Sequence, residues 1–518
     1  MNKYSKDIIA IAFSIISISV FFALTGSINS GYHLTDDHEI IRITRDLSDH
    51  SFFEVVKKWV NKDMNIRYRP MYFVNRVFES KLFGNNFTYW SLFNVFLLLI
   101  SMLGFYFGMR KLKFSIFESL GYIFMVFIGE QMAIWWRLGP NETIGMFFLG
   151  IAFLFMVCNQ RNYTRNTAFF AFFLILASLS KESFTIVIPA FLVFKIWHEK
   201  QQFNLTWKEA ILKNKILIIP FIVLFINIFL IVFKVGTNKI GYAGVDGHGF
   251  LELLNGIGLI IDFNLKWYLI MILLFFLTLY YLNKANHALK FFAVKLALPF
   301  VFFLLIIIPN LVLYAKSGMD ERYLLPALIG VVYLLISIVK ETRVFSFKWS
   351  YIFLSVIFLL VLTKLPRTYF TAKSFTVEGI ETNKFLNAIV KNYPSSPSIL
   401  LVVDPVFSNE WASSTIRYLH ITKGIDIYAF ILEDSTNWVG YEYMAERLRI
   451  SWEDRYNNLG YQNMSEDPTQ ILFLQKNLIN PFFEENSMNP QDFSNMLNNE
   501  NRFTVFIKHD LLNADFFE

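Results

Sequence analysis

Long apolar stretches recur along the first 365 residues of the chain and are separated by short polar segments. About 20 consecutive apolar residues cross the roughly 30 Å hydrocarbon core of a bilayer. We therefore predict a polytopic α-helical membrane protein with about 11 transmembrane helices. A further stretch at 250–262 predicts an interfacial or re-entrant helix. The predicted spans are 8–27, 90–109, 116–135, 143–158, 167–180, 183–197, 215–234, 264–282, 293–315, 323–340 and 349–365.

Lysine and arginine residues gather on alternate sides of these spans. Cytoplasmic loops carry an excess of both residues, so the side that holds them is predicted to be cytoplasmic. The opposite side then receives loop 28–89, the short segments near 136–142 and 181–182, and the chain after about 366. The residues that set this orientation are Lys3, Lys6, Arg110, Lys111, Lys113, Arg161, Arg165, Lys200, Lys208, Lys213, Lys215, Lys284, Lys290, Lys340, Arg343 and Lys348.

The pattern changes after residue 365. The segments "SILLVVDPVF", "IDIYAFIL" and "FTVFIKHD" are short apolar runs typical of buried strands, with helix-like polar stretches between them. We predict two domains. Residues 1–365 form a transmembrane domain that carries external loop 28–89, and residues 366–518 form a soluble extracytoplasmic α/β domain. The Gly-rich segment 234–250 is either a mobile lid or a plain connector.

Composition agrees with a membrane protein and excludes some functions. Of 518 residues, 55% are hydrophobic and only 17% are charged, whereas soluble domains have about 25% charged residues. The net charge of +6 is too small and too dispersed to favour nucleic acid. The single cysteine, Cys158, excludes disulfides within the chain and cysteine metal sites.

Ionisable residues are concentrated on the predicted external face. Asp36, Asp37, His38 and Glu39 follow the first span by about ten residues, near headgroup level. Separate segments bring cations and their neighbours to the same face, and such residues usually face a cavity or a partner. Singly, each cation could instead snorkel to the interface, and the aromatics could form a belt. The residues are Arg69, Arg137, Lys181 and Arg322, with Glu142, Glu182 and Tyr323 beside them.

Four motifs occur in an order that resembles polytopic glycosyltransferases of the GT-C fold. They are "LTDDHEI", "YRPMYFVNR", "LSKESFTIVIP" and "ERYLLPA", and together they span residues 35–327. The set is similar to the branch that contains protein O-mannosyltransferases and aminoarabinose transferases, and to bacterial enzymes that modify surface glycans. Membrane proteins with tetratricopeptide repeats share the motifs most closely, but the tail of this chain is α/β instead. The acceptor therefore cannot be carried over.

The resemblance implies an inverting transfer of a sugar from polyprenyl phosphate to an acceptor hydroxyl, and we predict a surface glycan such as O-antigen as the acceptor. An acceptor hydroxyl needs a base, and Asp36 is predicted to fill that role. Asp37 would orient the acceptor or share a divalent cation with Asp36. Lys181, Arg322, Arg137 and Arg69 are predicted to hold the donor phosphate, because Arg and Lys stabilise the charge that develops there.

The remaining residues have supporting roles in this hypothesis. His38 is either a ligand of a divalent cation or an ordinary loop histidine, and Glu39 begins a helix whose first turn favours acids. Glu142 and Glu182 would be counter-ions of Arg137 and Lys181. No cofactor is required, and metal dependence is open. The expected partners are the lipid-linked donor, a glycan acceptor and the bilayer of a bacterial inner membrane. A transporter or flippase of lipid-linked sugars is the alternative, although such proteins place charges at the midplane.

Overall fold

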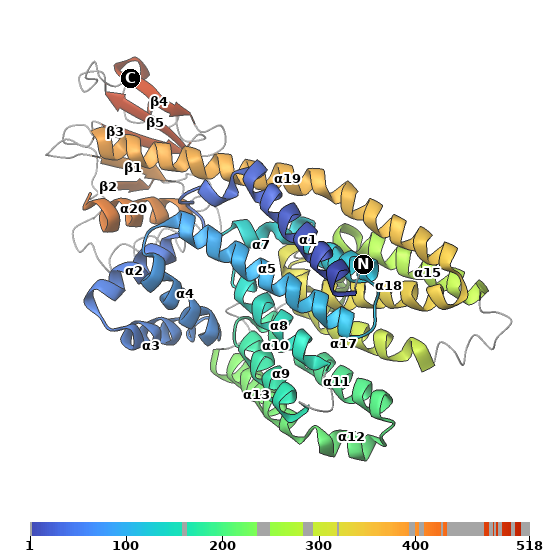
Figure 1. Ribbon diagram of the computed structural model, residues 1–518. Coiled ribbons are helices and arrows are strands. Elements are labelled where there is room, and N and C mark those ends of the chain that lie inside the picture. The colour runs from blue at the N-terminus through green and yellow to red at the C-terminus, as the bar shows by residue number, and fades with distance from the viewer. Residues whose placement is uncertain are drawn as a thin grey trace. The chain divides into compact units, whose positions relative to one another are not determined.

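A computed structural model describes most of the chain and shows a largely helical protein (Figure 1). The residues described are 3–157, 163–235, 249–282, 294–318, 321–392, 399–403, 409–425, 428–431, 471–475, 480, 483–484, 489–498 and 503–508. The Gly-rich segment 234–250 lies almost wholly outside them. The chain forms two compact units. The first comprises Met1–Ile28, Ser51–Glu79 and Tyr89–Lys373, and the second comprises Asn29–His50, Ser80–Thr88 and Ser374–Glu518.

The first unit is a set of apolar helices. Their order follows the predicted apolar stretches, with two short helices, α3 and α4, inside the predicted external loop. The helices are α1 (Lys3–Thr25), α3 (Phe52–Asp63), α4 (Pro70–Phe83), α5 (Phe87–Lys111), α6 (Ile116–Phe127), α7 (Ala133–Trp136), α8 (Glu142–Met156), α9 (Tyr163–Ser178), α10 (Glu182–Thr185), α11 (Ile188–Phe203), α12 (Trp207–Lys213), α13 (Ile218–Phe229), α14 (Phe250–Ile260), α15 (Lys266–Leu282), α17 (Ala297–Tyr314), α18 (Leu325–Phe345) and most of α19 (Phe347–Asn392).

The protein is a multi-pass membrane protein, but its described helices do not give eleven spans. Six are long and apolar enough to cross a bilayer, and two bent pairs raise the number to eight. Three predicted spans correspond to α8, α9 and α11, which have 15, 16 and 16 residues. At 1.5 Å per residue these helices extend only about 22–24 Å, which is short of the roughly 30 Å hydrocarbon core. The spans were predicted from the lengths of apolar runs. The length of a helix depends instead on where it begins and ends, which the apolar pattern does not fix.

The second unit combines helices with a five-stranded sheet. The order of its strands is β2-β1-β3-β5-β4, with β1 parallel to β2 and β3, and β5 antiparallel to β3 and β4. Strands lie in all three segments predicted to contain them, and α20 connects β1 to its parallel neighbour β2, as parallel pairing requires. The elements are α2 (His38–Asp49), the end of α19, β1 (Ile399–Val403), α20 (Asn409–Lys423), β2 (Tyr428–Ile431), β3 (Ile471–Gln475), β4 (Phe493–Asn498) and β5 (Phe503–Lys508).

The two units differ from the predicted domains. The prediction assigned the whole of 28–89 to the transmembrane domain, yet Asn29–His50 and Ser80–Thr88 belong to the unit that contains the sheet. The predicted boundary at 365 falls inside α19, which continues without a break to Asn392. Contacts between residues far apart in the sequence decide this division, and apolar patterning does not report them.

A glycine breaks the helix that starts at Ile116. Gly129 has a φ of +134°, a conformation that other residues avoid, and the chain bends by 73° between α6 and the segment Glu130–Trp136. The last turn of α6 leaves carbonyl groups without helical donors. The Gln131 side-chain amide donates to three carbonyls near the break, those of Met125, Val126 and Ile128, at 2.9–3.4 Å. The Gln131 side chain thus supplies donors to carbonyls that the bend leaves without helical partners.

Helices α5 and α8 approach closely through glycine. Gly104 and Gly108 in "GFYFG" form a G-x-x-x-G pattern, which permits close approach of membrane helices. A Cβ atom at Gly104 would lie 2.4 Å from the carbonyl oxygen of Gly150, which is backbone and cannot rotate away. The two helix backbones must therefore separate if Gly104 gains a side chain.

We expect Gly104→Ala to destabilise the protein by about 1–3 kcal/mol through overpacking. Thermal unfolding in detergent should show a lower midpoint. Gly258→Ala is the matched control, because a Cβ atom there meets nothing within 4 Å and alanine favours a helix by about 1 kcal/mol over glycine. Equal midpoints for the two variants would contradict the close approach.

Candidate active site

The predicted catalytic acids occupy a strained turn at the start of α2. Asp36 has a φ of +67°, in the left-handed region that Asp and Asn tolerate better than most residues. The Asp36 carbonyl accepts from the Glu39 N–H at 3.3 Å, and the Asp37 N–H donates to the Thr35 carbonyl at 2.9 Å. Asp36 is half-buried, whereas Asp37 is 2% exposed. Strain of this kind is common at functional sites, and only Asp36 of the pair is open to a ligand.

Asp37 is held by His33, a residue that the sequence analysis did not identify. The Asp37 carboxylate accepts from the His33 backbone N–H at 2.9 Å, and its Oδ2 lies 3.6 Å from the His33 Nδ1. The His33 ring stacks on Phe375 at 3.8 Å, and its Nε2 lies 3.0 Å from the Phe375 carbonyl oxygen. Burial raises the pKa of Asp37, and His33 offsets only part of that rise. The buried Asp37 side chain therefore stabilises the turn through its contacts with His33.

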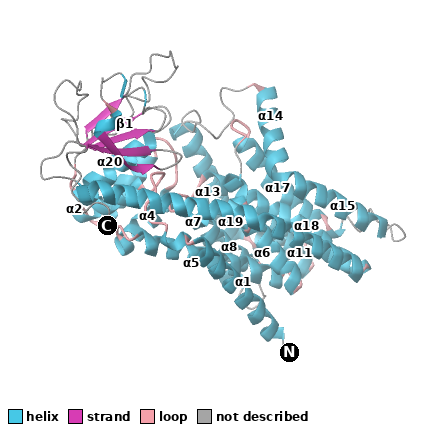
Figure 2. Cartoon of the chain, turned by 90° about the horizontal axis from the view of Figure 1, so that it is seen from above, coloured by secondary structure: helices cyan, strands magenta, loops and turns pink. Residues whose placement is uncertain are grey.

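Residues near position 410 also hold this turn. The Asp36 N–H donates to Glu410 Oε1 at 3.0 Å, and the Trp411 indole donates to the Thr35 hydroxyl at 3.2 Å. Both partners lie in the first turn of α20, which lies beside α2 (Figures 1 and 2). The strain at Asp36 is thus compensated by contacts more than 370 residues away in the chain. The position of His33, four residues before Asp37, could have indicated their contact from the sequence. No pattern in the sequence indicated the contact between Glu410 and Asp36.

Lys181 and Glu142 form a buried ion pair in the first unit. Their side chains are 3% and 2% exposed. Lys181 Nζ lies 4.2 Å from the ring centre of Tyr323, whose hydroxyl accepts from Arg322 at 3.0 Å. Burial alone would raise the pKa of Glu142, but Lys181 and Arg322 outweigh it and the pKa lies below its usual value. Burial also lowers the pKa of Lys181. Glu142 therefore remains ionised beside two cations.

Arg69 belongs to a neighbouring group. Its guanidinium donates to both carboxylate oxygens of Asp63, at 2.6 and 3.2 Å. The negative charge of Glu182 favours higher pKa values for Asp63, Arg69 and Lys181. The positive charge of Arg67 favours lower pKa values for Asp63 and Lys181. Burial raises the pKa of Asp63 despite Arg69, and Asp63 raises the pKa of Arg69 despite burial.

We name these residues the cation cluster. It contains four basic and three acidic side chains, so its formal net charge is +1. Its members are Arg67, Arg69, Lys181, Arg322, Asp63, Glu142 and Glu182, with Tyr323 between Lys181 and Arg322.

Arg137 lies in a loop that neighbouring helices fix through its backbone. The carbonyls of Arg137, Leu138 and Gly139 accept hydrogen bonds from Asn94, Arg76 and Tyr72 respectively. Arg76 also pairs with Glu79 at 3.3 Å and is 4% exposed. The Arg76 guanidinium of "YRPMYFVNR" therefore holds this loop.

The remaining predicted residues lie at the start of α2. His38 is its first residue and Glu39 lies in its first turn, as predicted for Glu39. Among the residues that the structure describes, no three His, Cys, Asp or Glu side chains gather as a metal site. The two acids and the cation cluster lie in different compact units. Their action on one substrate remains a prediction.

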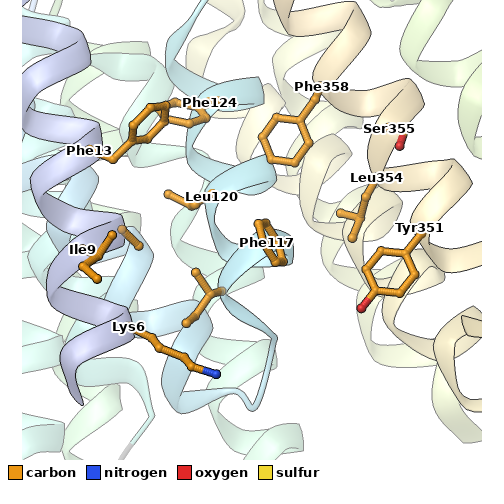
Figure 3. A pocket seen from close by; sticks show the side chains of 12 residues that line it. Lys6, Ile9, Phe13, Phe117, Leu120, Phe124, Tyr351, Leu354, Ser355 and Phe358 are labelled. Atoms are coloured by element: carbon orange, nitrogen blue, oxygen red, sulfur yellow. The ribbon is translucent and has the colours of Figure 1, made fainter. Parts of the chain in front are cut away.

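Two of the cavities in the described part of the first unit are large, and neither is lined by a member of the cation cluster. One has a volume of about 690 Å³ and lies among α1, α6 and α19. Figure 3 shows Phe13, Leu120 and Phe358 around it, with the Lys6 ammonium at one end. Its walls are nearly all apolar. The other cavity, of about 390 Å³, is lined by more polar residues.

Comparison with known proteins gives a weak structural similarity. No family model and no curated protein matches the sequence. Crystal structures of ArnT from Cupriavidus metallidurans, one bound to undecaprenyl phosphate and one in the apo state, align at a TM-score of 0.46 and 11% identity. The alignments cover 97% of this chain and 99% of the bound structure, and 99% and 100% for the apo structure. At these values neither residues nor activities can be transferred.

Proposed function

We propose that this protein is an inverting glycosyltransferase that moves a sugar from a polyprenyl-phosphate donor to a hydroxyl of a surface glycan, such as O-antigen, on the outer side of a bacterial inner membrane. The observation that carries the proposal is the cation cluster. A donor of this class contains a phosphodiester with one negative charge, and the cluster retains one positive charge. Buried cations in a membrane protein are costly and usually mark a functional site.

The proposed reaction is a single displacement. The acceptor hydroxyl gives its proton to Asp36, its oxygen forms a bond to the anomeric carbon, and the bond from that carbon to the phosphate oxygen breaks. The leaving phosphate takes the electron pair, and Lys181 and Arg322 stabilise its charge. Attack from the face opposite the leaving group inverts the anomeric centre. No carboxyl group needs to protonate the leaving oxygen, in contrast to glycosidases.

The two aspartates are expected to respond differently to substitution. Asp37→Asn preserves an oxygen that accepts from the His33 N–H and resembles the protonated acid that burial favours. We expect it to lower the transfer rate by less than about tenfold, which is below the 10²–10⁴-fold contribution of a general base. Initial rates of the purified variants, measured side by side, test this. If Asp37→Asn lowered the transfer rate more than Asp36→Asn, Asp37 rather than Asp36 would be the base.

Transfer in the absence of a membrane barrier tests the function itself. Purified protein in detergent is given a radiolabelled polyprenyl-phosphate sugar and a lipid-linked glycan acceptor. Inverted product made without a sealed vesicle supports the enzyme. If no labelled product forms with any donor, while reconstituted vesicles translocate the labelled lipid, the protein is a flippase and the proposal is wrong.

A further inference from the structure

The second cavity lies beside the break in the helix that starts at Ile116. It has a volume of about 390 Å³ and is bounded by the Glu130–Met132 turn and by α15, α18 and α19. Figures 1 and 2 show these three helices side by side. None of the predicted site residues lines it. The residues that do are Glu130, Gln131, Phe263, Trp267, Tyr268, Leu328, Leu360, Thr363, Lys364 and Arg367.

Two cations from α19 face this cavity. Lys364 Nζ donates to the Tyr268 hydroxyl and lies 4.2 Å from its ring centre. Arg367 pairs with Glu130, and its side chain is 72% exposed. The lining thus holds two positive charges and one negative charge. A singly charged phosphodiester would neutralise the remaining positive charge, and Arg is suited to bind phosphate oxygens.

The cations lie at the depth of lipid headgroups. Helix α19 begins at Phe347, next to the predicted cytoplasmic Lys348. Lys364 and Arg367 follow that start by roughly 26–30 Å of helix, which is about the thickness of the hydrocarbon core. They therefore reach the interface at the other end of the span, where lipid phosphates lie.

Large apolar side chains form the outer wall of the cavity. Phe263 and Trp267 are 75% and 64% exposed. Exposed aromatic residues at this depth are typical of the membrane interface. The cavity therefore opens toward lipid rather than toward the interior of the unit.

We propose that this cavity binds the headgroup of an anionic bilayer phospholipid, with Lys364 and Arg367 on the phosphodiester and the acyl chains along Phe263 and Trp267. The bound lipid links the break after α6 to the middle of α19. The site is separate from the proposed donor site and does not depend on the proposed transfer reaction.

Lipid binding to the full-length protein in detergent tests the proposal by native mass spectrometry. The probes are phosphatidylglycerol and phosphatidylcholine, added separately. We expect one tightly bound phosphatidylglycerol, and binding about tenfold weaker or less in Lys364→Gln/Arg367→Gln, because two charge-assisted contacts are lost. Lys348→Gln/Lys373→Gln is the matched control, since it removes two exposed charges from the same helix outside the cavity. Equal losses in both double variants, or equal binding of both lipids, would overturn the site.

Two further measurements keep the result interpretable if the double variant folds poorly. Glu130→Gln removes the carboxylate that competes for Arg367, so phosphatidylglycerol should bind several-fold more tightly. Unchanged or weaker binding counts against the proposal. Competition with a polyprenyl monophosphate tests whether the cavity prefers a bilayer phospholipid or the polyprenyl lipid of the proposed donor. If that lipid displaces phosphatidylglycerol at equal or lower concentration, the cavity belongs to the donor and the proposal is wrong.

Discussion

Asp36→Asn is expected to lower the rate of sugar transfer by about 10²- to 10⁴-fold, the usual contribution of a general base. Asn has nearly the same shape as Asp but cannot take a proton from the acceptor hydroxyl. It also tolerates the left-handed backbone at this position, so the turn and its hydrogen bond to Glu410 should persist. Initial rates with a labelled polyprenyl-phosphate sugar provide the measurement.

Asp49→Asn is the control for this result. Asp49 is the last residue of the same helix, α2, and is exposed. The control should transfer sugar at the rate of the unmodified protein, and thermal unfolding should show equal midpoints for all three proteins. Transfer by Asp36→Asn at the unmodified rate would exclude Asp36 as the base.

Lys181→Met should have the second large effect, on both stability and transfer. The substitution leaves the buried Glu142 carboxylate without its main partner, and breaking a buried pair in this way costs about 3–5 kcal/mol. Adding Glu142→Gln removes the unpaired charge, so the double variant should recover most of the lost stability. It should not recover transfer, because the cation that we propose to stabilise the leaving phosphate is still absent.

A second buried pair provides the comparison. Lys195 and Glu199 on α11 are both fully buried and lie 2.7 Å apart, and neither belongs to the cation cluster. Lys195→Met should destabilise the protein similarly, but its folded fraction should retain transfer. If the double variant of Lys181 and Glu142 transferred sugar normally, the cluster would have only a structural role.

Much of the candidate site could be read from the sequence because local patterns report local structure. The helix after the Asp pair, with Glu39 in its first turn, follows from "DDHEIIRI". The ion pair of Lys181 was also anticipated in part, since a buried cation needs a counter-ion. Its partner is Glu142, whereas the sequence analysis offered Glu142 and Glu182 for Arg137 and Lys181 without pairing them. Asp63, the partner of Arg69, was not identified.

The sequence by itself determined that this is a helical membrane protein with strand-forming segments near its end, because apolar runs and their periodicity depend only on neighbouring residues. Only the tertiary structure decided where the described helices begin and end, that His33 holds Asp37, and that Glu410 binds the Asp36 backbone. These outcomes depend on where helices end and on which distant residues become neighbours. Both are set by packing and by the need of buried polar groups for partners.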